Sequence, residues 1–301
     1  MILTNNLTPD SACRTFLSND ISFVSFSNAI LFDGKQVIHP ERLVRYENDM
    51  SLIIDDTKSA EDKKRRRDIV VKTDINGVYC LLSIEHQSTI DKNMVIRCGN
   101  YEMMEYLKQL KNKKIKGLVP QVMIVFYTGD KKWNAPVKLS NYFDIPEELK
   151  AYINEWKIIL VDVKEIDTSK IKDEQTRYFL EAIQEMYKGN FEGLHRRIKI
   201  NRDNFIYAAI ITGSLDLIRD LPEGDEIDMC EGMERMTEGF RSEGKLEEKR
   251  STLKEQLEIK LGTISNNLEL QLTNATLEKL NILTRNIFNI TNEEDVLKII
   301  N

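Results

Sequence analysis

The sequence predicts a mixed α/β fold followed by a helical region. From about residue 20 to 165, β-rich apolar runs alternate with helical patterns. Two of the later runs are apolar almost throughout, which is typical of strands that helices cover on both faces. Strand patterns stop after about residue 170. We therefore expect an α/β domain over residues 1–170 and an all-helical region over residues 171–301.

The elements are expected in the order helix, three strands, helix, two strands. The first helix is predicted over residues 21–34 and closed by Gly34. Strand patterns follow at residues 49–56, 67–75, 78–86, 120–129 and 156–163, with a helix from Asp91 to Lys111 before the last two. Beyond residue 170, helices are predicted at 173–190 and 202–220. Residues 228–262 are predicted to be an exposed helix or a linker that leads into one.

Composition places limits on the function. The chain has 301 residues, of which 41% are hydrophobic, and a net charge of −6. This charge gives no global reason to expect nucleic-acid binding, so any basic surface must be local. The four cysteines show no pairing pattern, which indicates free thiols in a reducing cytosol. Neither a signal peptide nor a membrane span is evident, so we expect a cytoplasmic protein.

Asn76-Gly77 between two apolar runs predicts a two-residue type I′ hairpin. In that register the numbers of facing residues sum to 153, so Asp68 faces Glu85. Their Cβ atoms would lie about 4.5–5.5 Å apart, where two carboxylates repel each other. A divalent metal such as Mg²⁺ removes the repulsion. A longer turn would shift this register, and facing acids at strand ends are also common on surfaces.

Residues beside these acids extend the predicted site. Gln87 shares the face of Glu85 and lies opposite Arg66 in this register. His86 points to the other face, so its side chain is interpreted as a packed or surface histidine, although its backbone carbonyl could still bind the metal. A basic run precedes Asp68 and is either a solvated cluster or a phosphate-binding segment: Lys63, Lys64, Arg65, Arg66 and Arg67. We expect Arg66 near the cut, aided by Arg67, and Lys63 and Lys64 on flanking phosphates.

These motifs resemble a known family. The pattern Asp68 … Glu85-x-Gln87, the segment "NMVIRCGNY" and the segment "VPQVMIVFYTGDKKW" are similar to those of the recombination-promoting nuclease (Rpn) family. These YhgA-like transposases belong to the PD-(D/E)XK nuclease superfamily. The resemblance covers roughly residues 19–245. It implies an αβββαβ restriction-endonuclease-like core with a mixed sheet.

The resemblance also implies a chemistry and a partner. Asp68, Glu85 and the carbonyl of His86 would hold Mg²⁺, or Mn²⁺, for phosphodiester hydrolysis of DNA. Arg97 and Tyr101 lie four residues apart on the following helix and resemble the family's helix motif, although Tyr101 is equally explained as a core residue. Gly129 and Trp133 match the loop after the fourth strand and are interpreted as structural. No nucleotide cofactor or membrane partner is expected, and a homodimer is left open.

Two departures from the family pattern leave three hypotheses open. Ser25 stands where the family has an acid in its opening helix, and a serine cannot replace a carboxylate as a metal ligand. Gln87 stands where the superfamily often has lysine, and it can orient water or phosphate but cannot act as a general base. The chain is therefore an active DNA endonuclease, a nuclease-fold protein that binds DNA without cutting, or a protein-interaction module that works through its helical tail.

Overall fold

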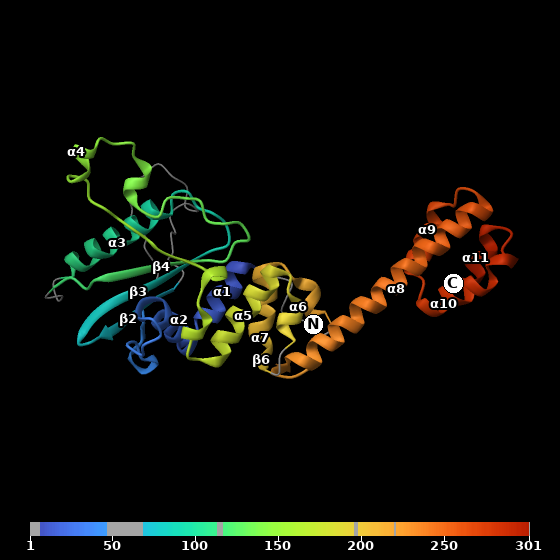
Figure 1. The fold of residues 1–301 in the computed structure, drawn as a ribbon, viewed down its shortest axis with the longest axis horizontal. Helices are drawn as coiled ribbons and strands as arrows, with labels where there is room; N and C mark the ends of the chain where they lie inside the picture. Colours follow the sequence, from blue (N-terminus) through green and yellow to red (C-terminus); the bar gives the residue numbers. More distant parts are fainter. Residues whose placement is uncertain (1–6, 47–68, 113–116, 196–197, 220, 301) are drawn as a thin grey trace. The chain divides into compact units, whose positions relative to one another are not determined.

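The computed structural model describes residues 7–46, 69–112, 117–195, 198–219 and 221–300 (Figure 1). The chain forms two compact units, residues 1–231 and 232–301. The strand predicted at residues 49–56, the basic run at 63–67 and Asp68 lie outside the described residues.

A five-stranded sheet organises the first unit. Its order is β1-β2-β3-β4-β5, with antiparallel pairing from β1 to β3 and parallel pairing from β3 to β5. The strands are β1 (Val44–Arg45), β2 (Ile69–Ile75), β3 (Val78–Gln87), β4 (Gln121–Tyr127) and β5 (Ile159–Asp162). The mixed sheet and the order of α2, β2, β3, α3, β4 and β5 agree with the prediction. β1 is not the strand predicted at residues 49–56, and the helix Pro9–Leu17 was not predicted.

The hairpin between β2 and β3 confirms the predicted turn. Asn76 and Gly77 both have positive φ angles, 52° and 85°, as a type I′ turn requires. Ile75 pairs with Val78, and the ladder continues in the predicted register to the pair Ile69 and Ile84. One further step would bring Asp68 opposite Glu85, so that part of the register stays a prediction.

Helices cover both faces of the sheet (Figure 1). On one face lie α1 (Pro9–Leu17) and α2 (Asp20–Phe32), where the Phe26 ring meets the Phe126 ring of β4 edge to face at 4.9 Å. On the other face lies α3 (Met94–Lys111), whose residues Met94, Val95 and Cys98 pack with Val125 of β4. Because alternate residues of β3 and β4 point to opposite faces, each face has its own apolar layer.

The helix predicted at residues 21–34, which is α2, ends as predicted. After α2, Asp33 and Gly34 both adopt left-handed backbone conformations, with φ angles of 56° and 79°. A Cβ at Gly34 would lie 2.8 Å from the carbonyl oxygen of Lys170. A side chain at this position would therefore strain both the turn and its contact with the backbone of Lys170 in η5 (Thr168–Lys170).

The boundary between the units differs from the predicted one near residue 170. Helices α5 (Glu174–Lys188) and α7 (Arg202–Thr212) belong to the first unit, and the Phe179 ring of α5 stacks on the Phe16 ring of α1 at 3.7 Å. The region after residue 170 is also not wholly helical, because β6 (Lys199–Asn201) and β7 (Glu226–Asp228) form an antiparallel pair. Three-residue strands are too short to produce a period-two pattern in the sequence.

The second unit is helical. The long α8 (Met229–Leu261) begins in the first unit, and α9 (Asn266–Asn274), α10 (Leu277–Asn286) and α11 (Glu293–Ile300) follow. Their core includes Leu257, Leu268, Leu280, Leu283 and Val296, each of which is fully buried. This confirms a helix, and not a linker, over the charged stretch at residues 229–261.

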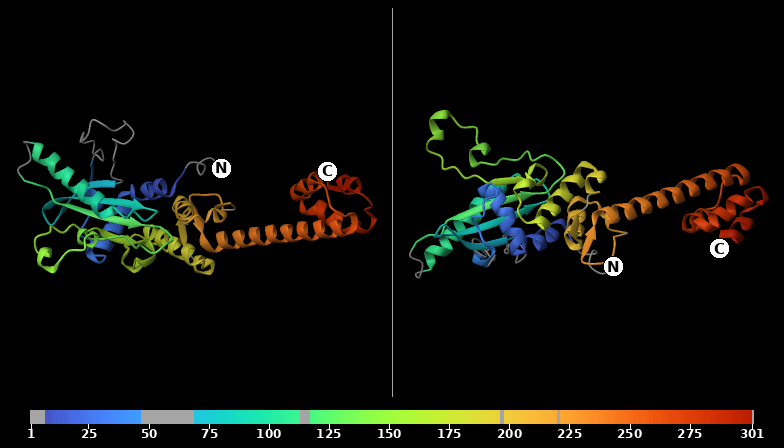
Figure 2. Two further views of the ribbon diagram at one scale, coloured as in Figure 1. Left: turned by 90° about the horizontal axis from the view of Figure 1, so that it is seen from above. Right: turned by 60° about the horizontal axis from the view of Figure 1, so that its bottom comes forward.

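Short elements complete the description. They are η1 (Pro40–Arg42), η3 (Leu139–Tyr142), α4 (Glu147–Lys150), η4 (Val163–Glu165), η5 (Thr168–Lys170), α6 (Phe191–Leu194), η6 (Leu215–Ile218) and η7 (Ile287–Asn289). Residues 128–158 form a long connection between β4 and β5 that contains α4 (Figure 2). Within the described ranges, no helix has the length and apolar character to cross a membrane.

Replacing Gly77 by alanine should lower the free energy of unfolding by about 1 kcal/mol. A Cβ in the left-handed region costs about 1–2 kcal/mol. Part of this cost is offset because alanine leaves the unfolded chain fewer conformations than glycine does. A Cβ at Gly244 of α8 would meet no described atom within 4 Å, so Gly244→Ala is the contrasting variant and should be neutral or stabilising. Urea denaturation checks both. Wild-type stability of Gly77→Ala would contradict the assigned turn.

Candidate nuclease site

The candidate site lies where β3 ends, on the face of the sheet that α3 covers. Glu85 pairs with Val125 across the parallel ladder, and Val125 packs against α3. Glu85 and Gln87 share a face because side chains alternate along a strand. The site is therefore built from the end of β3 and the first turns of α3.

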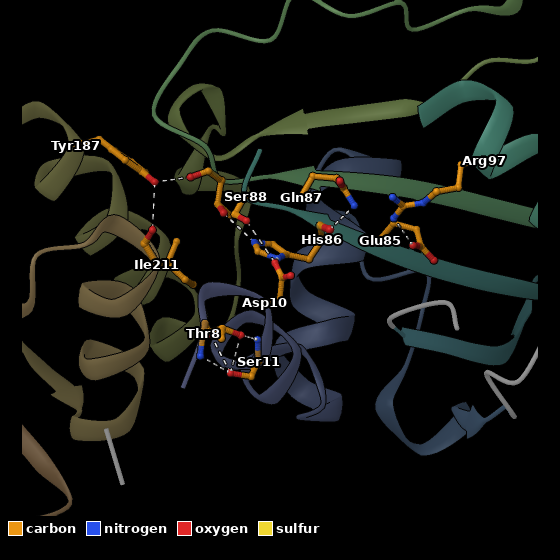
Figure 3. Close-up of polar contacts among 11 residues, drawn as sticks. Thr8, Asp10, Ser11, Glu85, His86, Gln87, Ser88, Arg97, Tyr187 and Ile211 are labelled. Carbon is orange, nitrogen blue, oxygen red and sulfur yellow. Dashed lines mark hydrogen bonds and ion pairs between the residues drawn. The ribbon is translucent and has the colours of Figure 1, made fainter. Parts of the chain in front are cut away.

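Glu85 is a buried carboxylate held by an arginine. Its side chain is 1% exposed, and its Oε2 lies 3.3 Å from Nη2 of Arg97. The Nη1 of Arg97 reaches Oδ2 of Asp91 at 3.0 Å, so the guanidinium bridges two acids. Figure 3 shows the Glu85 carboxylate beside this guanidinium. A buried carboxylate requires such compensation, because the loss of water costs several kcal/mol.

The same pairing affects the acid–base chemistry of Arg97. Burial alone would lower its pKa, but the Glu85 carboxylate, helped by Tyr101 and Asp91, outweighs this and raises the pKa of Arg97 above its usual value. The guanidinium therefore stays charged. Its Nε is buried and has no hydrogen-bond partner among the described residues. The predicted contact between Arg97 and nucleic acid stays a prediction, and the described contacts assign this side chain to the two acids.

His86 points to the opposite face and connects three elements. Its Nδ1 lies 2.8 Å from Oδ1 of Asp10 in α1, and its Nε2 lies 2.7 Å from Oγ1 of Thr128 after β4 (Figure 3). The side chain is only 2% exposed. Since both ring nitrogens are engaged, the metal role predicted for His86 would fall to its backbone carbonyl. That carbonyl accepts a 2.6 Å hydrogen bond from Nε2 of Gln87.

Gln87 connects the end of β3 to the end of β4. Its backbone carbonyl accepts a hydrogen bond from the N–H of Thr128 at 2.9 Å. The Tyr187 hydroxyl of α5 donates to the carbonyl of Thr128, and burial raises the pKa of Tyr187 to about 12, so this hydroxyl remains a donor at neutral pH (Figure 3).

Tyr101 belongs to a stripe of polar residues on α3 that the sequence revealed only in part. Tyr101 is 3% exposed and follows Arg97 by one turn. Glu105, one turn further on, is fully buried and accepts hydrogen bonds from the Tyr46 hydroxyl at 2.8 Å and from Nε2 of Gln109 at 3.3 Å. The spacing of four residues from Arg97 to Tyr101 to Glu105 was visible in the sequence, but the burial of an acid at its end was not.

Ser25 has a structural partner. The residue is 5% exposed in α2. Its hydroxyl accepts a hydrogen bond from the backbone N–H of Asp173 at 3.0 Å. Asp173 caps α5 through a hydrogen bond from the N–H of Thr176 at 2.7 Å. At the position where the family resemblance led us to expect an acid, a serine joins α2 to the start of α5.

The other half of the predicted site falls outside the described residues. The structure does not describe residues 47–68, which include Asp68, Lys63, Lys64, Arg66 and Arg67. Within the described ranges, no three His, Cys, Asp or Glu side chains gather in a way that could hold a metal ion. Glu85 offers the carboxylate oxygens that Mg²⁺ prefers, so the donor chemistry of the described half fits, and the second acid would be Asp68.

The comparisons with known proteins identify the family. Residues 54–204 match the family described as "Putative transposase, YhgA-like", which is half of the 301-residue chain. The chain therefore belongs to this family, and membership indicates a transposase- or nuclease-like role. No curated protein and no solved structure matches it.

Replacing Arg97 by methionine should destabilise the first unit by about 3 kcal/mol, because the buried Glu85 carboxylate loses the Arg97 guanidinium. The double variant Glu85→Gln/Arg97→Met should recover much of this loss. Arg177→Met is the matched control, since the Arg177 side chain is 29% exposed and pairs with an exposed Glu174. The control should cost less than about 1 kcal/mol. Equal losses in Arg97→Met and the control, measured by denaturant titration, would argue against a buried ion pair.

The bond between Asp10 and His86 should make stability sensitive to acid. The hydrogen bond from His86, against some burial, lowers the pKa of Asp10 below its ordinary value of 3.8. This stabilisation is present above pH 3.8 and is lost as the pH falls below it through the folded pKa. Asp10→Asn should therefore be less stable than wild type at neutral pH, and the difference should shrink below about pH 4. Thermal unfolding against pH checks this, with Asp216→Asn as the control for removing an exposed carboxylate. A constant difference would contradict the assignment.

Proposed function

We propose that this protein is a metal-dependent DNA endonuclease of the PD-(D/E)XK type that hydrolyses phosphodiester bonds. The observation that carries the proposal is the buried Glu85 at the end of β3, in a hairpin whose described ladder ends at Ile69 and Ile84, one step short of the predicted pair of Asp68 and Glu85. Membership in the YhgA-like transposase family and the αβββαβ order of elements support it.

In this proposal Asp68 and Glu85 hold Mg²⁺, with Mn²⁺ as a substitute. When bound, the metal supplies charge to polarise the phosphate and to lower the pKa of a water. Arg97 holds the Glu85 carboxylate in one orientation on the rigid first turns of α3. A fixed ligand lowers the cost of assembling the site when DNA arrives.

The neighbouring side chains bind and orient the substrate. Gln87 follows Glu85 on the same face, and its amide is suited to orient a water or a phosphate oxygen by hydrogen bonding. Tyr101 follows Arg97 on α3 and would add a hydroxyl to the same wall. Arg66 and Arg67 would stabilise the phosphate charge that grows in the transition state, while Lys63 and Lys64 would bind the flanking backbone.

A second candidate function is DNA binding without cleavage. The contact between Ser25 and Asp173 favours it, because the position of the family's helix acid carries a hydroxyl that is already used in joining two helices. A site with only Asp68 and Glu85 would hold one metal in place of two.

Cleavage of supercoiled plasmid separates the two functions. Wild-type protein with Mg²⁺ or Mn²⁺ should convert the plasmid to nicked or linear forms, and EDTA should abolish this. Asp68→Ala and Glu85→Gln should each lower the rate at least about 100-fold, because each removes a metal ligand. Asp216→Ala, at an exposed position in η6, should cut like wild type.

The outcomes assign the function. Metal-independent cleavage, or full activity of Asp68→Ala, would overturn the proposed site. Wild-type protein that binds DNA in a salt-sensitive way but never nicks it would support the second function.

A further inference from the structure

Lys131 and Lys132 lie close to the end of β3 that carries Glu85 and Gln87. They belong to residues 128–133, here named the lysine loop, which begins where β4 ends. The N–H of Thr128 donates to the carbonyl of Gln87 at 2.9 Å, and Tyr127 is the ladder partner of Gln87. The lysine loop therefore starts directly beside the candidate site.

An internal cation holds the backbone of this loop. The Lys164 ammonium donates to the carbonyl oxygen of Gly129 and lies 3.4 Å and 3.5 Å from those of Asp130 and Lys131. The carboxylate of Asp162 is 3.4 Å away. Three consecutive carbonyl dipoles thus point at one protein cation, which fixes the path of the loop. Lys164 is occupied by these partners and is not itself a surface charge for a ligand.

Aromatic packing fixes the loop from a second side. The Tyr127 hydroxyl donates to the carbonyl of Lys131 at 2.7 Å, and the Trp133 ring meets the Tyr127 ring edge to face at 5.0 Å. A Cβ at Gly129 would lie 2.4 Å from the Tyr127 hydroxyl oxygen, so only glycine fits there. These contacts agree with the interpretation of Gly129 and Trp133 as structural residues, because both help to hold the lysine loop in place.

The loop presents two lysines to solvent. Lys131 and Lys132 are both exposed, and within the described part of the chain neither ammonium lies within 4.0 Å of a carboxylate. Other lysines of this chain, such as Lys150 and Lys188, pair with nearby glutamates. Two adjacent exposed lysines on a held loop, with no carboxylate partner among the described residues, therefore place positive charge beside the site, next to one exposed carboxylate, Asp130.

We propose that the lysine loop binds backbone phosphates of DNA beside the cut, with Lys131 and Lys132 as the contacting charges. The inference rests on the proposed nuclease function and extends it to a second phosphate-binding element. Lysine binds phosphate as a point charge without reading sequence. A loop that is already ordered loses little conformational entropy when it binds.

Salt-titrated binding to a duplex oligonucleotide in EDTA tests the proposal without any cleavage. In Lys131→Ala/Lys132→Ala, the slope of log affinity against log salt should fall by about two. Lys245→Ala/Lys249→Ala in α8 removes the same charge from the second unit and should leave the slope unchanged. The stability of the loop variant should match wild type because both side chains are exposed.

Lys164→Met tests the internal cation separately. Lys164 makes no proposed DNA contact, and Lys245→Ala removes the same single charge elsewhere. A loss of DNA affinity in Lys164→Met that exceeds the loss in Lys245→Ala would therefore come from a change in the conformation of the loop. We expect the affinity of Lys164→Met to fall toward that of the Lys131→Ala/Lys132→Ala variant. Binding equal to that of Lys245→Ala would overturn the role given to Lys164.

Failure of this proposal is distinguishable from failure of the proposed function. If wild-type protein binds DNA in a salt-sensitive way and the loop variant has the same slope and affinity as its control, the lysine loop is not a phosphate site and the nuclease proposal stands. If wild-type protein shows no salt-sensitive binding, the proposed function is overturned and the loop proposal with it.

Discussion

The burial of one carboxylate constrains the structure around the candidate site. Glu85 lies at the end of a central strand, under a helix and almost without solvent contact. Such a group is stable only if a cation and hydrogen-bond donors replace the water it loses. Arg97 meets this need, and Asp91 holds Arg97 from the other side. The start of α3 is therefore tied to the end of β3 by charge as well as by the apolar contacts of Val125.

The next residue imposes the same requirement on the opposite face. His86 is buried against α1 and the end of β4, and Asp10 and Thr128 satisfy its two ring nitrogens. Consecutive residues of one strand thus connect α3 on one face to α1 on the other. The end of β3 is fixed from both sides, which is what a site needs if its ligands are to keep one geometry.

The end of β4 extends this arrangement into the lysine loop. The carbonyl of Thr128 accepts a hydrogen bond from the Tyr187 hydroxyl, and its side chain contacts His86. Its backbone N–H donates a hydrogen bond to the carbonyl of Gln87. The loop that follows is held by Lys164 and Tyr127. Helix α5, which supplies Tyr187 and stacks on α1, is therefore a structural part of the first unit, and a boundary near residue 170 would separate Tyr187 from its partner Thr128.

The sequence by itself determined the features that depend on local chemistry. The Asn76-Gly77 turn, the register of β2 and β3, the end of α2 and the apolar strands β4 and β5 all follow from patterns within a few residues. Only the tertiary structure decided which polar side chains meet: His86 with Asp10, Ser25 with Asp173, and Lys164 with the lysine loop. These partners lie far apart in the chain, and their pairing depends on how the helices pack on the sheet. The short pair of β6 and β7, and the place of α5 and α7 in the first unit, depend on the same packing, because burial of an apolar face against a distant element leaves no local signal of its partner.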